Sequence, residues 1–310
     1  MNKLELQVNQ IKGGRSTVPR ADRRMTENST NQYWTMRIRP HERLWHIDLG
    51  EIWRYRDLIE LFVRRNIVVQ YKQTILGPLW YLIQPILTVI MNMVVFGGIA
   101  KMSTDGMPQA LFYMAGNICW FYFSDCLNQS SSTFTANQDM FGKVYFPRLV
   151  VPIAVVISNL LRFAIQAGLF VALYLYFFMN GAPIAPNWAT LLTPLLVVMI
   201  AGLGLGFGIL ISSLTTKYRD FTILFTFIVQ LWMYATPIVY PLSMVEEGPL
   251  RTLIMANPMT SIIEAFKYAT LGQGYFSWLA LGYSSLFMSV LLLFSVVIFN
   301  KVQRNFMDTV

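Results

Sequence analysis

Charged and uncharged stretches alternate along the chain. Five long runs contain no charged residue, and they cover residues 73–100, 106–124, 163–216, 221–245 and 268–300. A helix needs about 20 apolar residues to cross the roughly 30 Å of bilayer hydrocarbon. The run 163–216 is long enough for two such helices, and it is interrupted at residues 180–186 by Asn-Gly-Ala-Pro-Ile-Ala-Pro. The pattern predicts six spans, at about 78–100, 108–128, 149–178, 188–211, 221–240 and 279–300.

The composition agrees with a bilayer as the solvent. Hydrophobic residues make up 55% of the 310 residues and charged residues 13%, whereas a soluble domain carries about 25% charged residues. A β-barrel would alternate in segments of about ten residues, which this chain does not. We therefore expect an all-α integral membrane protein and exclude an ordinary soluble enzyme, a disordered chain and a disulfide scaffold. Cys119 and Cys126, one above the other in the second span, are interpreted as packing groups.

The basic residues are sorted along the chain in a way that predicts its orientation. Of the 24 lysines and arginines, 14 precede residue 78, and six more fall on the same side, at residues 143, 148, 217, 219, 301 and 304. The positive-inside rule then places both termini in the cytoplasm. The net charge of +8 is explained by this topology rather than by nucleic-acid binding. Residues 1–50 are polar and are interpreted as a cytoplasmic tail without a cleavable signal peptide.

Residues 51–77 are predicted to form an amphipathic helix in the cytoplasmic interface. Apolar residues such as Ile59 and Phe62 recur at helical spacing, and basic residues fill the opposite face. The alternative, a surface helix packed on its own domain, is disfavoured because little soluble protein is nearby. The basic residues expected to meet lipid phosphates are Arg54, Arg64, Arg65 and Lys72.

The six-span domain is predicted at 78–303, followed by a short cytoplasmic tail at 304–310. Between the fifth and sixth spans, residues 241–277 are too apolar for a free loop and too short for another pair of spans. Helical spacing predicts two short helices there, at about 249–256 and 259–270, folded back against the outer leaflet.

The sequence lacks the residues that catalysis or nucleotide hydrolysis would require. It has no P-loop, and the glycine run Gly202–Gly208 lies in an apolar span, where close helix packing is favoured over a dinucleotide loop. The acidic residues are too scattered to hold a metal and a diphosphate, and His41 and His46 both precede the membrane. We expect no enzyme activity, no catalytic residue, no metal site and no cofactor in this chain.

Two charges fall inside predicted spans, where an unpaired charge costs at least a few kcal/mol. Asp125 and Arg162 lie at similar depth in the antiparallel second and third spans, so we hypothesise that they pair. The pair either locks this hairpin or serves transport, and the sequence leaves both open. Aromatic residues in spans one, two and five are candidates for stacking on sugar rings, with packing or lipid contact as the alternative for each. They are Trp80, Tyr81, Trp120, Phe225, Phe227, Trp232 and Tyr234.

Several motifs occur in an order that resembles one family. They are Arg56-Asp-Leu-Ile59, Arg64-Arg65, Tyr71-Lys-Gln-Thr-Ile-Leu-Gly-Pro-Leu-Trp80 with Gln84-Pro85, Gly116 to Trp120, Lys143-Val-Tyr-Phe-Pro-Arg148, Thr236-Pro-Ile-Val-Tyr240 and Asn257-Pro-Met259. Together they resemble the membrane (permease) subunits of type-2 ABC exporters for O-antigen, teichoic acid and capsule polysaccharide. The resemblance covers roughly residues 45–310 and leaves the role of residues 1–44 open.

The resemblance implies a permease that exports lipid (undecaprenyl diphosphate)-linked polysaccharide across the bacterial inner membrane. It implies a homodimer with two copies of a separate ATPase, which would bind the ATP and Mg²⁺, and a channel lined by spans one and five with the outer helices as its gate. The basic interface residues would meet the lipid diphosphate. The ATPase would contact Lys143, Phe146, Pro147 and Arg148, and also Lys217 and Arg219. The alternatives are an exporter of another amphiphile on the same scaffold and a membrane-embedded enzyme of envelope-glycan synthesis.

Overall fold

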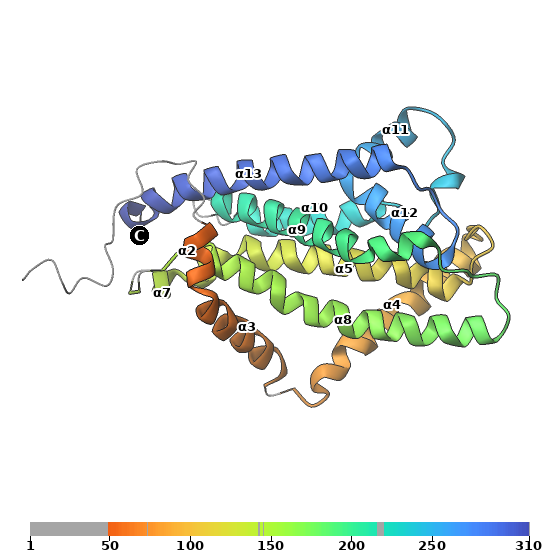
Figure 1. The fold of residues 1–310 in the computed structure, drawn as a ribbon, viewed down its shortest axis with the longest axis horizontal. Helices are drawn as coiled ribbons and strands as arrows, with labels where there is room; N and C mark the ends of the chain where they lie inside the picture. The colour runs from red at the N-terminus through yellow and green to blue at the C-terminus, as the bar shows by residue number, and fades with distance from the viewer. Residues whose placement is uncertain (1–48, 73, 142, 145, 216–219, 310) are drawn as a thin grey trace, which may run out of the picture. The chain divides into compact units, whose positions relative to one another are not determined.

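A computed structural model describes residues 49–309, apart from residues 73, 142, 145 and 216–219. The described residues are mostly helical and include no strand (Figure 1). The first half contains α2 (Leu49–Arg54), α3 (Arg56–Tyr71), η1 (Gly77–Leu79), α4 (Trp80–Asn92), the π-helical η2 (Met93–Ile99), α5 (Gln109–Ser131), α6 (Thr133–Ala136) and α7 (Gln138–Phe141). The second half contains α8 (Val150–Met179), η3 (Trp188–Leu192), α9 (Thr193–Thr215), α10 (Asp220–Tyr234), η4 (Leu242–Met244), α11 (Pro249–Ala256), α12 (Pro258–Leu271) and α13 (Trp278–Thr309).

Four helical segments are both long enough and apolar enough to cross a membrane. They are Gly77–Ile99, Val150–Met179, Trp188–Thr215 and Trp278–Gln303, and they match the first, third, fourth and sixth predicted spans. The second predicted span corresponds to α5, a helix of 23 residues whose polar side chains lower its hydropathy. The fifth corresponds to α10, which has 15 residues and ends at Tyr234, three residues before Pro237. At 1.5 Å per residue α10 is about 22 Å long, so alone it falls short of the bilayer core.

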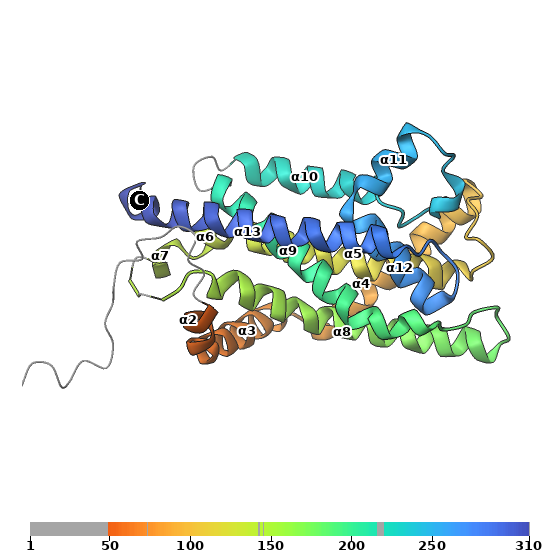
Figure 2. The ribbon, with the colours of Figure 1, turned by 45° about the horizontal axis from the view of Figure 1, so that its top comes forward.

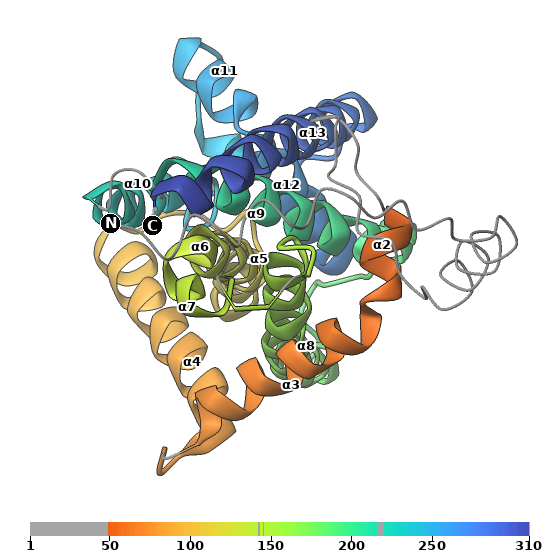
Figure 3. The same cartoon turned by 90° about the vertical axis from the view of Figure 1, so that its left-hand side faces the viewer.

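Helix α5 lies at the centre of the bundle, with α4, α8, α9 and α10 around it (Figure 3). Helix α5 contacts α9 closely because the glycines of the 202–208 run on α9 face α5 and α13 in alternation. A Cβ on Gly204 or Gly208 would meet α5, and a Cβ on Gly202 or Gly206 would meet α13. The run therefore lets α9 fit between two helices, which confirms the predicted role in close helix packing.

One end of the bundle, which we call the proximal end, is held by a cluster of phenylalanines. The cluster includes Phe62, Phe134, Phe141, Phe146 and Phe299. The rings of Phe134 and Phe299 stack at 4.6 Å, and Phe62 of α3 lies 5.8 Å from Phe146. The predicted interface helix is thus two helices with a break at Tyr55, and the apolar face of α3 packs on α8 and this cluster. Helix α8 supplies the protein surface that the sequence argument expected to be lacking, and the position of α3 in the membrane interface stays a prediction.

The opposite, distal end carries α11 and α12, which lie at the two positions predicted for short helices (Figure 1). Asn257 caps α12 by accepting a hydrogen bond from the Met259 amide, and Pro258 occupies the first turn. Gly272 ends the helix with φ +81°, in the left-handed region that favours glycine. Their placement as re-entrant helices against the outer leaflet stays a prediction.

Candidate functional site

The structure brings Asp125 and Arg162 together. The Arg162 Nη1 atom lies 2.6 Å from Asp125 Oδ2, and the Arg162 Nη2 atom donates to Gln84 Oε1 at 2.7 Å. The Arg162 guanidinium also lies 5.2 Å from the centre of the Tyr81 ring. The Tyr81 hydroxyl donates in turn to Gln70. These contacts join α8 to α5, α4 and α3.

The ion pair neutralises both charges within the protein. The Arg162 and Asp125 side chains are 16% and 22% exposed, so each relies mainly on the other and on neighbouring polar groups for solvation. The sequence predicted the pair but not the contributions of Gln84 and Gln70. The Gln84-Pro85 motif could have pointed to Gln84, since a polar residue in an apolar span needs a partner.

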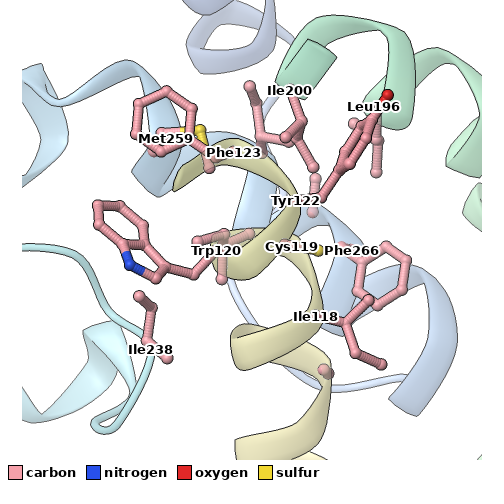
Figure 4. Packing of buried hydrophobic residues seen from close by; sticks show 14 of the residues in the cluster. Ile118, Cys119, Trp120, Tyr122, Phe123, Leu196, Ile200, Ile238, Met259 and Phe266 are labelled. Atoms are coloured by element: carbon pink, nitrogen blue, oxygen red, sulfur yellow. The ribbon is translucent and has the colours of Figure 1, made fainter. Parts of the chain in front are cut away.

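The aromatic residues proposed for a channel fall into two groups. Trp80 on α4 and Phe227 and Tyr234 on α10 are 50%, 61% and 58% exposed. Trp120 is 3% exposed and packs against Phe123 and Trp232, with Phe225 also packed against this core. Figure 4 shows the Ile238 side chain close to the Trp120 ring. We therefore leave Trp120 out of the proposed channel lining.

The four basic residues proposed to meet lipid phosphates are all exposed on or beside α2 and α3. They are Arg54, Arg64, Arg65 and Lys72. The Arg65 guanidinium lies 4.8 Å from the centre of the Phe62 ring, so its stem covers apolar surface while the charge stays accessible. Trp53 and Val69, on the same pair of helices, are 70% and 67% exposed. Exposed basic and apolar side chains side by side suit the boundary between lipid headgroups and acyl chains.

The loop before α8 presents a smaller surface than the sequence predicted. Lys143 is exposed and Pro147 half-buried, but Phe146 and Arg148 are buried. Arg148 donates to the Gln303 carbonyl at 3.1 Å and lies over the Phe141 ring at 5.3 Å. Desolvation lowers the pKa of this guanidinium from its ordinary value. Arg148 thus holds the loop onto α13, and Phe146 packs it against Phe62 of α3. Their predicted contact with an ATPase stays a prediction.

Lys217 and Arg219, proposed as a second partner contact, lie outside the described residues. The tail 1–44, whose role the sequence left open, also lies outside them. Among the residues that the structure describes, no three His, Cys, Asp or Glu side chains come together as a metal site.

The sequence missed a buried charge pair at the distal end. Lys267 and Glu264 on α12 have side chains only 1% and 3% exposed, with 3.5 Å between Lys267 Nζ and Glu264 Oε1. Lys267 Nζ donates to the Pro237 carbonyl at 2.6 Å and lies 3.8 Å from the centre of the Phe112 ring. Glu264 accepts a hydrogen bond from the Tyr275 amide at 3.2 Å. The sequence did contain an indication of this pair, because a Glu and a Lys lie three residues apart in an otherwise apolar helix.

Comparison with known proteins relates this helical bundle to a described family. The model of the ABC-2 type transporter family matches residues 57–271, more than half of the chain. The chain belongs to this family. The match begins in α3 and ends at the last residue of α12, so it includes the ion-pair network, the loop before α8 and the buried pair on α12.

Named relatives of this ABC-2 family member are proteins of O-antigen export and of polysialic acid transport. The chain is 27% identical to the O-antigen export system permease protein RfbA of Myxococcus xanthus, over 70% of this chain and 81% of that protein. It is 26% identical to the RfbA of Klebsiella pneumoniae, over 81% and 94%. It is 25% identical to the polysialic acid transport protein KpsM of Escherichia coli, over 78% and 92%. Because the chain belongs to the ABC-2 type transporter family and contains several long apolar helices, it is a multi-pass membrane protein.

Proposed function

We propose that this chain is the permease subunit of an ATP-driven exporter for lipid (undecaprenyl diphosphate)-linked polysaccharide such as O-antigen. The observation that carries the proposal is the match to an O-antigen export permease and to a polysialic acid transport protein over 94% and 92% of their lengths. The chain contains no P-loop, so a separate ABC ATPase, two copies per transporter, would bind and hydrolyse ATP with Mg²⁺. The permease would lie in the bacterial inner membrane with six crossings, with α5 and α10 as the second and fifth, and with both termini cytoplasmic.

The proposed assembly is a homodimer that encloses the channel. Helices α4 and α10 support this arrangement because they bury little of their surface within one chain. Val229 is the one buried residue of α10 among those described, and Leu87 and Met91 on α4 are more than half exposed. A second copy would cover part of this surface, and Trp80, Phe227 and Tyr234 would supply aromatic faces along which a glycan slides.

The proximal end would hold the cytoplasmic elements of the mechanism. Arg54, Arg64, Arg65 and Lys72 carry positive charge that would attract the lipid diphosphate at the headgroup level. Lys143 would contact the ATPase, and the buried Phe146 and Arg148 would pass the movement of the loop to α3 and α13 through the phenylalanine cluster.

Deletion of the gene and affinity purification of the tagged chain test this function. The deleted strain should lose its surface polysaccharide and accumulate the lipid-linked glycan inside, and the tagged chain should copurify with an ATP-hydrolysing protein. Retention of the surface polysaccharide together with loss of an intracellular glycosyl transfer would instead identify an enzyme and overturn the proposal.

A further inference from the structure

The segment at the distal end of α10 is much more buried than the helix itself. Within Asp220–Tyr234 only Val229 is buried, whereas all four residues of the segment 236–239 are buried. Figure 2 shows α10 at the edge of the bundle, with α11 beyond its distal end. The contacts that fix α10 are therefore concentrated in the few residues that follow it.

Segment 236–239 packs between α5 and α12. On one side it meets Gly116 of α5, where an added Cβ would lie 3.0 Å from the Ile238 carbonyl oxygen. On the other side Asn257 donates to the Thr236 hydroxyl at 2.8 Å, and Lys267 donates to the Pro237 carbonyl at 2.6 Å. The proline cannot continue α10, and the buried carbonyl needs a donor, which the Lys267 ammonium supplies.

The bond from Lys267 is the stronger of the two side-chain contacts from α12. Lys267 is fully buried, its charge is balanced by Glu264 at 3.5 Å, and its ammonium lies over the Phe112 ring of α5. A charge-assisted hydrogen bond in such surroundings is stronger than a neutral one. One side chain thus joins α12, α5 and the end of α10.

We propose that Lys267 is a positioning residue that locks the distal end of α10 to α12, so that these helices move as one body when the channel exit opens. This proposal rests on the proposed function only for its consequence in export. The lock itself is a structural claim that can be measured whatever the chain transports.

Spin labels placed on the full-length chain in nanodiscs test the lock. Leu231→Cys on α10 and Leu253→Cys on α11 are suitable sites because these residues are 69% and 71% exposed, whereas the native Cys119 and Cys126 are buried. The label on α11 reports on α12 because α11 leads into α12 and packs on it, and α12 itself has no exposed residue. The distance distribution between the labels should be narrow in the parent chain and should broaden or shift in Lys267→Met.

Two further variants separate the lock from a charge effect. Lys267→Met/Glu264→Gln removes the carboxylate that the single variant would leave unpaired, and it should keep the broad distribution because the Pro237 bond is still missing. Arg251→Met breaks the ion pair between Arg251 and Glu247. This variant should leave the distribution narrow, because the Glu247 side chain is 92% exposed and such a surface pair contributes little. A parent-like distribution in the double variant would overturn the lock, since the effect would then belong to the unpaired Glu264.

Surface polysaccharide, normalised to the amount of chain in the membrane, tests the consequence for export. Both Lys267 variants should lower it by about tenfold, the change expected from loss of one charge-assisted hydrogen bond. Broad distributions with undiminished polysaccharide would overturn the role in export while leaving the lock intact. A parent strain whose surface polysaccharide does not depend on this gene would refute the proposed function alone, because the label distances would still decide the lock.

Discussion

Replacing Gly208 by alanine tests how closely α9 and α5 are packed. The new Cβ would lie 2.5 Å from Ser130 Cβ and 3.0 Å from the Leu127 carbonyl oxygen. Carbon atoms in contact lie about 3.5–4.0 Å apart, so the two helices would have to separate by about 1 Å. Neither contact atom is the flexible end of a side chain, so the strain falls on the helix backbones.

The expected magnitude follows from two opposing effects. Overpacking a well-filled site costs about 1–3 kcal/mol, while alanine favours a helix over glycine by about 1 kcal/mol. Gly168 in α8 is the matched control, because nothing lies within 4 Å of its added Cβ and only the helix preference remains. The difference between the two variants cancels that preference and leaves about 1–3 kcal/mol of overpacking.

Thermal unfolding of the purified chain in detergent measures this difference. At about 2 °C per kcal/mol for a chain of this size, Gly208→Ala should melt about 2–6 °C below Gly168→Ala. Gly202→Ala should fall between them, because its nearest neighbour is the flexible thioether of Met288. Equal melting temperatures for Gly208→Ala and Gly168→Ala would refute the close packing of α9 on α5.

Three further predictions concern the ion pair, the loop before α8 and the aromatic residues. Asp125→Asn leaves the Arg162 charge without its anion and should destabilise the chain by about 1–3 kcal/mol in thermal unfolding, less than a fully buried pair because both side chains are partly exposed; an unchanged melting temperature would contradict this. Arg148→Glu should lower the amount of folded chain in the membrane, whereas Lys143→Glu should keep that amount and lower surface polysaccharide, as immunoblots and glycan staining would show; the reverse pattern would contradict the assigned burial. Trp80→Ala should leave stability unchanged and reduce export of long chains, whereas Trp120→Ala should lower stability by about 3–5 kcal/mol. Equal stability of the two variants would contradict the placement of Trp120 in the core.

The sequence predicted the helices better than it predicted their neighbours. Hydropathy placed the third and fourth spans at 149–178 and 188–211, and the structure has Val150–Met179 and Trp188–Thr215. It also placed two opposite charges at one depth, because the geometry of an antiparallel hairpin can be counted along the chain. These features depend on local composition and spacing, which a single sequence contains.

The burial of individual residues could not be predicted in the same way. In lipid, an apolar side chain gains little free energy by packing on protein rather than on acyl chains. Hydropathy therefore does not distinguish Trp80 on the surface from Trp120 in the core. Arg148 shows the converse, since a basic residue in a short loop suggests an exposed contact. Its burial depends on α13 extending to the Gln303 carbonyl, more than 150 residues away in the sequence.

The distribution of packing indicates which helices can move during transport. Helices α5, α9 and α13 are packed through glycines that leave no space for a Cβ, so they can shift only together. Helix α10 is different, because Val229 is its one buried residue among those described. Lys267 binds Pro237 just beyond the last turn of α10, whereas α4 is held along its length by Arg162 at Gln84 and by the buried Val89 and Asn92 in its distal half. Because α10 is attached at its distal end, we expect its free proximal part to make the larger movements, so spin labels there should report larger changes on nucleotide binding than labels on α9.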